Sequence, residues 1–171
     1  MPAQAHGLGD PFTIDDTITI DPMLDARLRW EDVNAAKDAD AVTLRTRFGF
    51  EARQKTLGVS FLAEGEGTVA FDKGYNAFPF AHPASTQYRP ANAVIADPEG
   101  IELNRLQFQY KTRAFSLTLG RQRINLDDQR WVGNAGWRQN EQTFDAVRVE
   151  ANHGPLALDA TYAISQRTIY G

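Results

Sequence analysis

The stretch that decides the fold is RLQFQYKTRAFSLTLG, residues 105–120. Apolar and polar side chains alternate over two runs, Arg105–Thr112 and Ala114–Gly120, with only a short break at Thr112–Arg113. Alternation with period two is typical of a β-strand with two different faces, and a short break between two such runs predicts an antiparallel hairpin. This stretch therefore predicts two neighbouring strands with one apolar and one polar face.

The same alternation recurs in further runs along the chain. These runs are Met23–Val33, Val42–Ala52, Leu57–Val69, Asp145–Asn152 and Leu156–Ser165, and Thr13–Ile20 is a candidate for a further short strand. Leu62 breaks the pattern of its run, and no window of the sequence shows a helical stripe. The sequence therefore predicts an all-β chain of about seven or eight strands.

The connections between these runs differ in length. Short turns are expected at Arg53–Thr56, Thr112–Arg113 and His153–Pro155, and longer polar connections at Asn34–Asp40, Val69–Asn104 and Ile124–Thr143. In an up-and-down antiparallel sheet this order puts tight turns at one end and long loops at the other, as in transmembrane β-barrels. Several runs also reach the roughly 9–11 residues that a membrane-crossing strand needs.

We therefore predict an antiparallel up-and-down transmembrane β-barrel, which is incomplete in this chain. Its apolar face would contact lipid, and its charged face would line a water-filled lumen. A soluble antiparallel sheet that packs on a core shows the same alternation, and the alternation alone does not say which face is inside.

Composition excludes several classes of function. The chain has 171 residues, no cysteine and a formal net charge of −4. The acidic balance argues against non-specific nucleic-acid binding, and the lack of cysteine excludes disulfides, thiolate nucleophiles and zinc fingers. Neither a G-x-S-x-G nor an H-E-x-x-H motif occurs, so we expect no enzyme, no cofactor and no metal site.

Three segments resemble one protein family. They are RLRWE at residues 27–31, ADPEGIELN at residues 96–104 and LGRQRINLDDQRWVGNAGWRQNEQTFDA at residues 119–146. They resemble the alginate-export-like family of bacterial outer-membrane β-barrel porins, and the resemblance covers roughly residues 21–171. It implies a location in the outer membrane of a Gram-negative bacterium, with the lipid bilayer and a polar or anionic solute as partners.

The resemblance also suggests how the chain is organised. We expect a lead segment at residues 1–20 and the N-terminal part of a β-barrel porin domain at residues 21–171. Members of the family look more than twice as long, so we expect a fragment of a larger barrel. Residues 1–10 carry neither the basic segment nor the apolar core of a signal peptide.

Arginines are the candidate site residues, because 14 of the 18 basic residues are arginines and the guanidinium group binds carboxylates in a forked geometry. The candidates for the pore lining are Arg27, Arg29, Arg45, Arg47, Arg105, Arg121, Arg123, Arg130, Arg138 and Arg148. Alternatively, these arginines pair with carboxylates across the strands and simply hold the wall together. The candidates for a pore constriction are Arg121, Arg123, Arg130 and Arg138 with Gln122, Gln129, Gln139 and Asn140.

Two features of this loop region leave alternatives open. Arg121 and Arg123 share the parity of apolar Leu119, so either a bulge at Gly120 turns them inward or the strand has already left the membrane. Trp131 and Trp137 are candidates for a sugar contact, or else for interfacial or loop-anchoring positions.

The function that these patterns favour is an outer-membrane channel for a polar solute, anionic or saccharide-like, with an Arg-rich lumen. Two alternatives are a soluble β-barrel that binds a small ligand and a structural outer-membrane barrel that does not conduct. The identity of the solute, the total number of strands and the oligomeric state are not specified by these patterns.

Overall fold

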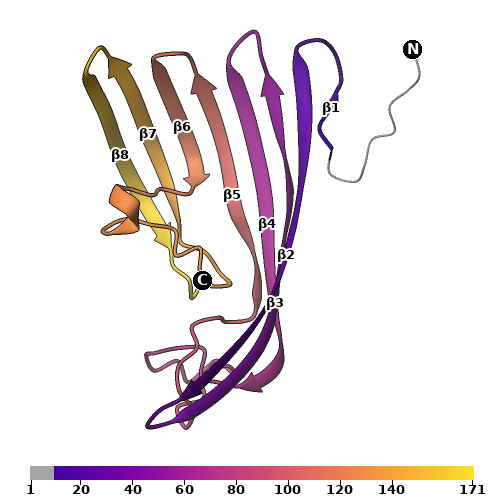
Figure 1. Ribbon diagram of the computed structural model, residues 1–171, viewed down its shortest axis with the longest axis vertical. Helices are drawn as coiled ribbons and strands as arrows, with labels where there is room; N and C mark the ends of the chain where they lie inside the picture. The colour runs from indigo at the N-terminus through magenta and orange to yellow at the C-terminus, as the bar shows by residue number, and fades with distance from the viewer. Residues whose placement is uncertain (1–9) are drawn as a thin grey trace.

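A single antiparallel sheet makes up the computed structural model, which describes residues 10–171. The strands are β1 (Phe12–Thr13), β2 (Ile18–Asn34), β3 (Asp38–Gln54), β4 (Val59–Gly74), β5 (Gly100–Lys111), β6 (Phe115–Gln122), β7 (Thr143–His153) and β8 (Leu156–Arg167). Each strand pairs with its neighbours in sequence, in the order β1 to β8 (Figure 1). The expectations for residues 1–9 lie outside the described residues. These residues make up nearly half of the expected lead segment and most of the stretch that was compared with a signal peptide.

The predicted fold class is confirmed. The sheet is all-β, antiparallel and up-and-down, and within residues 10–171 it stays open because β1 and β8 do not pair with each other. Each of the seven main predicted runs overlaps one strand, and several strands are longer than their runs. The candidate strand Thr13–Ile20 is not one strand, because it spans the end of β1, a turn and the start of β2. Among the described residues, no helix has the length and apolar character needed to cross a membrane.

The two ends of the sheet differ, although less regularly than the sequence predicts. The turns at residues 55–58, 112–114 and 154–155 lie together at one end, at the top of Figure 1. At the other end, residues 75–99 form the first long loop and residues 123–142 form the second long loop. The prediction of a longer connection at Asn34–Asp40 is wrong. The ladder between β2 and β3 continues to the pair Asn34 and Asp38, which leaves a tight turn at residues 35–37.

The two faces of the sheet have opposite character. The apolar face is exposed, with Leu28 67% and Trp30 74% accessible. The polar face is covered over β3 and β4, where Thr43, Glu66 and Thr68 are buried. Leu62 is also buried, on the polar face, which explains why it breaks the alternation of its run. A sheet that exposes its apolar face and covers its polar face is the reverse of a soluble sheet packed on a core.

The first long loop is held to β3 and β4 by a small apolar cluster. Its buried members are Ala39, Ala41, Ala70, Tyr75, Ala77, Phe78 and Ile95. Tyr75 also donates a hydrogen bond from its hydroxyl to the carbonyl oxygen of Asp97, at 2.8 Å. Small alanines on the strands let the larger loop side chains approach closely, so the loop has a fixed seat at this end of the sheet.

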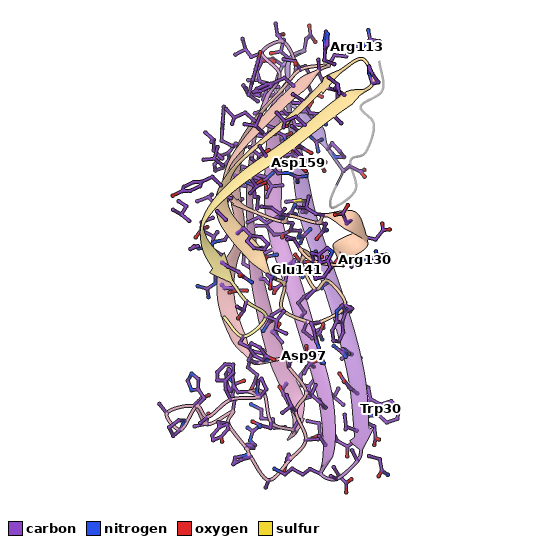
Figure 2. All side chains as sticks on the ribbon, turned by 90° about the vertical axis from the view of Figure 1, so that its left-hand side faces the viewer. Trp30, Asp97, Arg113, Arg130, Glu141 and Asp159 are labelled. Carbon is purple, nitrogen blue, oxygen red and sulfur yellow. The ribbon has the colours of Figure 1, made fainter. Side chains whose placement is uncertain are left out.

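The second long loop contains the 3-10 helix η1 (Asp127–Gln129). Figure 2 shows this helix and Arg130 standing out to one side of the sheet. It also shows Asp159, Glu141 and Asp97 following one another from the tight-turn end, marked by Arg113, toward the opposite end. The charged groups therefore occupy several levels along the strands.

Candidate functional site

Arg27 of β2 binds the second long loop to the polar face. Its guanidinium group donates to the carbonyl oxygens of Gly136 and Trp137, each at 3.0 Å, and also to that of Arg138. Its Nε donates to Oε1 of Gln139 at 3.0 Å. Among residues 10–171 no carboxylate forms an ion pair with Arg27, so the loop satisfies its hydrogen bonds but leaves its charge uncompensated.

Gln139 and Asn140 bring the same loop onto β3 and β4. Gln139 is fully buried, and its Nε2 donates to the hydroxyl of Thr43 at 2.8 Å and to the Thr43 carbonyl oxygen at 3.0 Å. The Thr68 hydroxyl donates to Oδ1 of Asn140 at 2.7 Å. The second long loop therefore crosses the polar face of β2, β3 and β4 instead of projecting from the end of the sheet.

A network of three carboxylates and three guanidinium groups lies beneath this loop. Glu64 pairs with Arg105 at 2.6 Å and with Arg123 at 3.1 Å. Glu141 pairs with both Arg123 and Arg47, and Arg47 also pairs with the sixth member, Glu66. The three glutamates are almost completely buried, and their charges match those of the arginines, so this network resembles the alternative in which the arginines brace the wall.

A less balanced region adjoins this network. Arg27 and Arg45 are direct cross-strand partners of β2 and β3, and like charges placed opposite each other repel. Arg45 has a single carboxylate partner, Asp25, and the buried Nε of Arg45 has no hydrogen-bond partner among the described residues. Both arginines line an open cleft of about 620 Å³, together with Asp25, Arg47, Glu64 and Arg123.

Trp137 lies in a second charged group of the polar face. The guanidinium group of Arg138 sits over its ring, 4.1 Å from the centroid, and that of Arg29 lies 5.9 Å away. Both arginines also pair with Glu31, Arg138 at 3.3 Å. Contacts of this kind between cations and aromatic rings stabilise the loop, so one side of the Trp137 ring is already occupied. Trp131, the other candidate for a sugar contact, is highly exposed.

Arg121 and Arg123, which share the parity of Leu119, lie in different surroundings. The register of β6 is regular at Gly120, and it places Arg121 beside apolar Leu106. There Arg121 pairs with Asp145 at 2.8 Å, whereas Arg123 reaches the polar face.

Two candidates lie further from the loop contacts. Arg148 pairs with Asp159 at 2.6 Å on the last two strands. Within residues 10–171, the Arg130 side chain beside η1 makes no ion pair.

Two ionisable side chains of the first long loop have shifted pKa values. Burial raises the pKa of Tyr75, with a further contribution from the neighbouring charges of Glu99 and Asp97. Partial burial alone would raise the pKa of Glu99, but hydrogen bonds from Lys73 and from the Ala70 amide outweigh it and hold that pKa below its usual range. Tyr75 therefore stays neutral and Glu99 stays ionised at neutral pH.

The geometry defines a class of protein. An antiparallel sheet with an exposed apolar face, a covered polar face and tight turns along one end is the wall of a transmembrane β-barrel. The chain belongs to the alginate export family, whose model matches residues 23–164. This family comprises outer-membrane porins of bacteria, so the protein is an outer-membrane β-barrel of a transporter family. Comparisons with curated proteins and with solved structures gave no match.

Sequence reasoning missed some residues of the site. Asp97 and Glu141 are almost completely buried and bind arginines of the polar face, yet neither was a candidate. Both lie in the segments that carry the family resemblance, and that is the one signal that could have singled them out. In residues 10–171 no group of three or more His, Asp or Glu side chains is placed to hold a metal ion.

Proposed function

We propose that the protein is an outer-membrane channel for a polar solute that carries carboxylate or saccharide-like groups. The observation that carries this proposal is the pair Arg27 and Arg45, two cross-strand arginines on one open cleft with a single carboxylate between them. An uncompensated positive charge beside water favours an anionic group in the cleft, and a guanidinium group can bind a carboxylate through two hydrogen bonds.

The second long loop supports the same proposal. It lies across the polar face, as Arg27 and Gln139 show, and therefore narrows the space that the lumen would offer. A solute that passes this narrowing would meet the cleft residues and the exposed side of Trp137. Arg–carboxylate contacts and hydrated hydroxyl groups would guide it, without covalent chemistry.

The test is the relative flux of a charged and a neutral sugar through the protein in lipid vesicles. Arg45→Gln should lower the flux of glucuronate relative to glucose, because it removes half of the unbalanced pair. Arg148→Gln is the matched control, since it also removes one arginine of the polar face, but one that two carboxylates already balance. Equal effects of the two variants would contradict the role of the cleft.

One observation favours a second candidate, a structural barrel that does not conduct. The network of Glu64, Glu66 and Glu141 with its arginines is charge-matched, and the second long loop covers part of the polar face. Small barrels can have interiors filled in this way. The same vesicles distinguish the two functions, because a filled barrel would pass neither glucose nor glucuronate above the rate of empty vesicles.

A further inference from the structure

The two long loops contact each other beside the proposed narrowing. Asp97 and Pro98 of the first long loop contact Gln139 and Asn140 of the second, and we name these four residues the loop junction. We propose that the loop junction, with Asp97 as its positioning residue, joins the two loops into one unit that sets the width of the passage. This inference rests on the proposed channel, and its first test does not require transport.

Asp97 binds three segments of the chain at once. Its Oδ1 accepts a hydrogen bond from the Gln139 backbone N–H at 3.0 Å, and its Oδ2 accepts one from Arg29 of β2 at 3.0 Å. The side chain is 1% exposed, so water does not compete for either oxygen. Hydrogen bonds to a buried charged group are stronger than those between neutral groups, which favours a single arrangement of the three segments.

A second contact reinforces the loop junction. Asn140 Nδ2 donates to the Pro98 carbonyl oxygen at 2.9 Å, while Asn140 Oδ1 accepts from Thr68 of β4. The two loops are thus bound to each other and to the wall by adjacent residues on each side. A displacement of one loop would break contacts of the other.

Each loop covers a different part of the polar face. The first long loop covers Ala41, which is 1% exposed within the apolar cluster. The second long loop covers Thr43, also 1% exposed and hydrogen-bonded to Gln139. Both residues lie on β3, so a single strand carries one reporter position for each loop. If the loops move as one unit, both positions must become accessible together.

The chain contains no cysteine, so a single introduced thiol reports its own accessibility. We would place Ala41→Cys or Thr43→Cys in the protein inserted in lipid vesicles and measure the rate of reaction with a small charged thiol reagent. Ser116→Cys is a third reporter, on the polar face of β6 beside the tight-turn end, and it controls for general loosening of the barrel. In the otherwise unchanged protein, the two β3 thiols should react slowly.

Asp97→Asn keeps the shape of the side chain and removes its charge. We expect it to raise the reaction rate about tenfold or more at both β3 positions and to leave Ser116→Cys unchanged. Asp159→Asn is the matched control, because it removes one carboxylate from an arginine of the same face, Arg148, on the last two strands and outside the cleft. Asn140→Ala, which leaves every charge in place, should act at both β3 positions in the same direction and more weakly.

Asn140→Ala also keeps the test decisive if Asp97→Asn does not insert into the membrane. Faster reaction at only one β3 position, or equal effects of Asp97→Asn and Asp159→Asn, would overturn the inference. So would faster reaction at Ser116→Cys by the same factor, since that would mean general destabilisation.

The channel supplies the second measurement. Asp97→Asn should increase the single-channel conductance more than Asp159→Asn does. If the unchanged protein conducts no ions, the proposed function fails, while the thiol rates still decide whether the loops form one unit. If the unchanged protein conducts and the thiol rates do not respond to Asp97→Asn, the inference fails alone.

Discussion

Replacing Leu28 by arginine tests which face of the sheet contacts lipid. Leu28 lies on the apolar face of β2, opposite Leu44 of β3, and is 67% exposed. Because its side chain makes few contacts within the sheet, the cost of Leu28→Arg comes mainly from its surroundings. In lipid the new charge is expensive, whereas in water it is almost free.

The depth of the residue sets the expected cost. We take the centre of each strand as the mid-plane of the membrane. Leu28 is about two residues from the centre of β2, which at about 3.3 Å per residue and a tilt of about 40° is a depth of ~5 Å from that plane. Phe71, on the same face of β4, is about four or five residues from the centre of its strand, or ~11 Å. We therefore expect Leu28→Arg to cost about 2–4 kcal/mol and Phe71→Arg about 0–1 kcal/mol.

The assay is equilibrium unfolding of the protein from lipid vesicles in urea, with the free energy of unfolding measured for both variants. Exposed positions on a protein surface in water usually change this free energy by less than about 0.5 kcal/mol. Values below that limit for both variants, or equal losses at the two depths, would refute the placement of the apolar face in the membrane.

Three further predictions concern stability. Gly120→Ala should lower the free energy of unfolding by about 1–3 kcal/mol, because φ at this position is +105° and a Cβ would lie 2.3 Å from a backbone oxygen. A Cβ at Gly100 would meet nothing within 4 Å, so the control Gly100→Ala should be nearly neutral in the same urea titration. Glu141→Ala should cost about 3–5 kcal/mol, because it takes one carboxylate from both Arg47 and Arg123 and leaves the buried network with three arginines and two glutamates. The exposed control Glu150→Ala should cost less than about 1 kcal/mol, and similar losses would contradict the burial of the network. The pKa of Glu99 is lower in the folded than in the unfolded protein, so ionised Glu99 stabilises the fold. This stabilisation is present above the unfolded-state pKa of about 4.3 and is lost as the pH falls through the pKa of the folded protein. Glu99→Gln should therefore lose less stability than the unchanged protein between neutral and acidic pH, as measured by urea midpoints, and equal losses would count against this role.

The sheet could be predicted from the sequence because its information is local. Period-two alternation identifies each strand and separates its two faces, as in Arg105–Thr112. The same rule placed the start of β3 too late, at Val42 instead of Asp38. Asn34 and Asp38 do not extend the apolar pattern, yet their backbones continue the ladder, which needs no apolar side chain. Polar strand ends are therefore invisible to alternation.

The candidate site could be predicted only in part. The arginines of the polar face were named from their parity, and pairing with carboxylates across the strands was one of the two interpretations offered for them. The loop partners Asp97 and Glu141 could not be named, because the loops have no repeating pattern. Gln139 lies 42 residues from Asp97 and 112 from Arg27 in sequence. No spacing rule connects positions so far apart, and only the folded wall brings them together.

The strict neighbour-to-neighbour order of the strands has a consequence for assembly. The strand pairs that tight turns connect can form as local hairpins soon after their residues are available, at a small entropic cost of closing the turn. The pairs β4–β5 and β6–β7 must also close the two long loops, which costs more. The hydrogen bonds from Arg27 to the second long loop instead require β2 through β6 to be in place. We therefore expect the wall to be built first and the loop to be seated last, so that the newly inserted protein passes through a wider form before it matures.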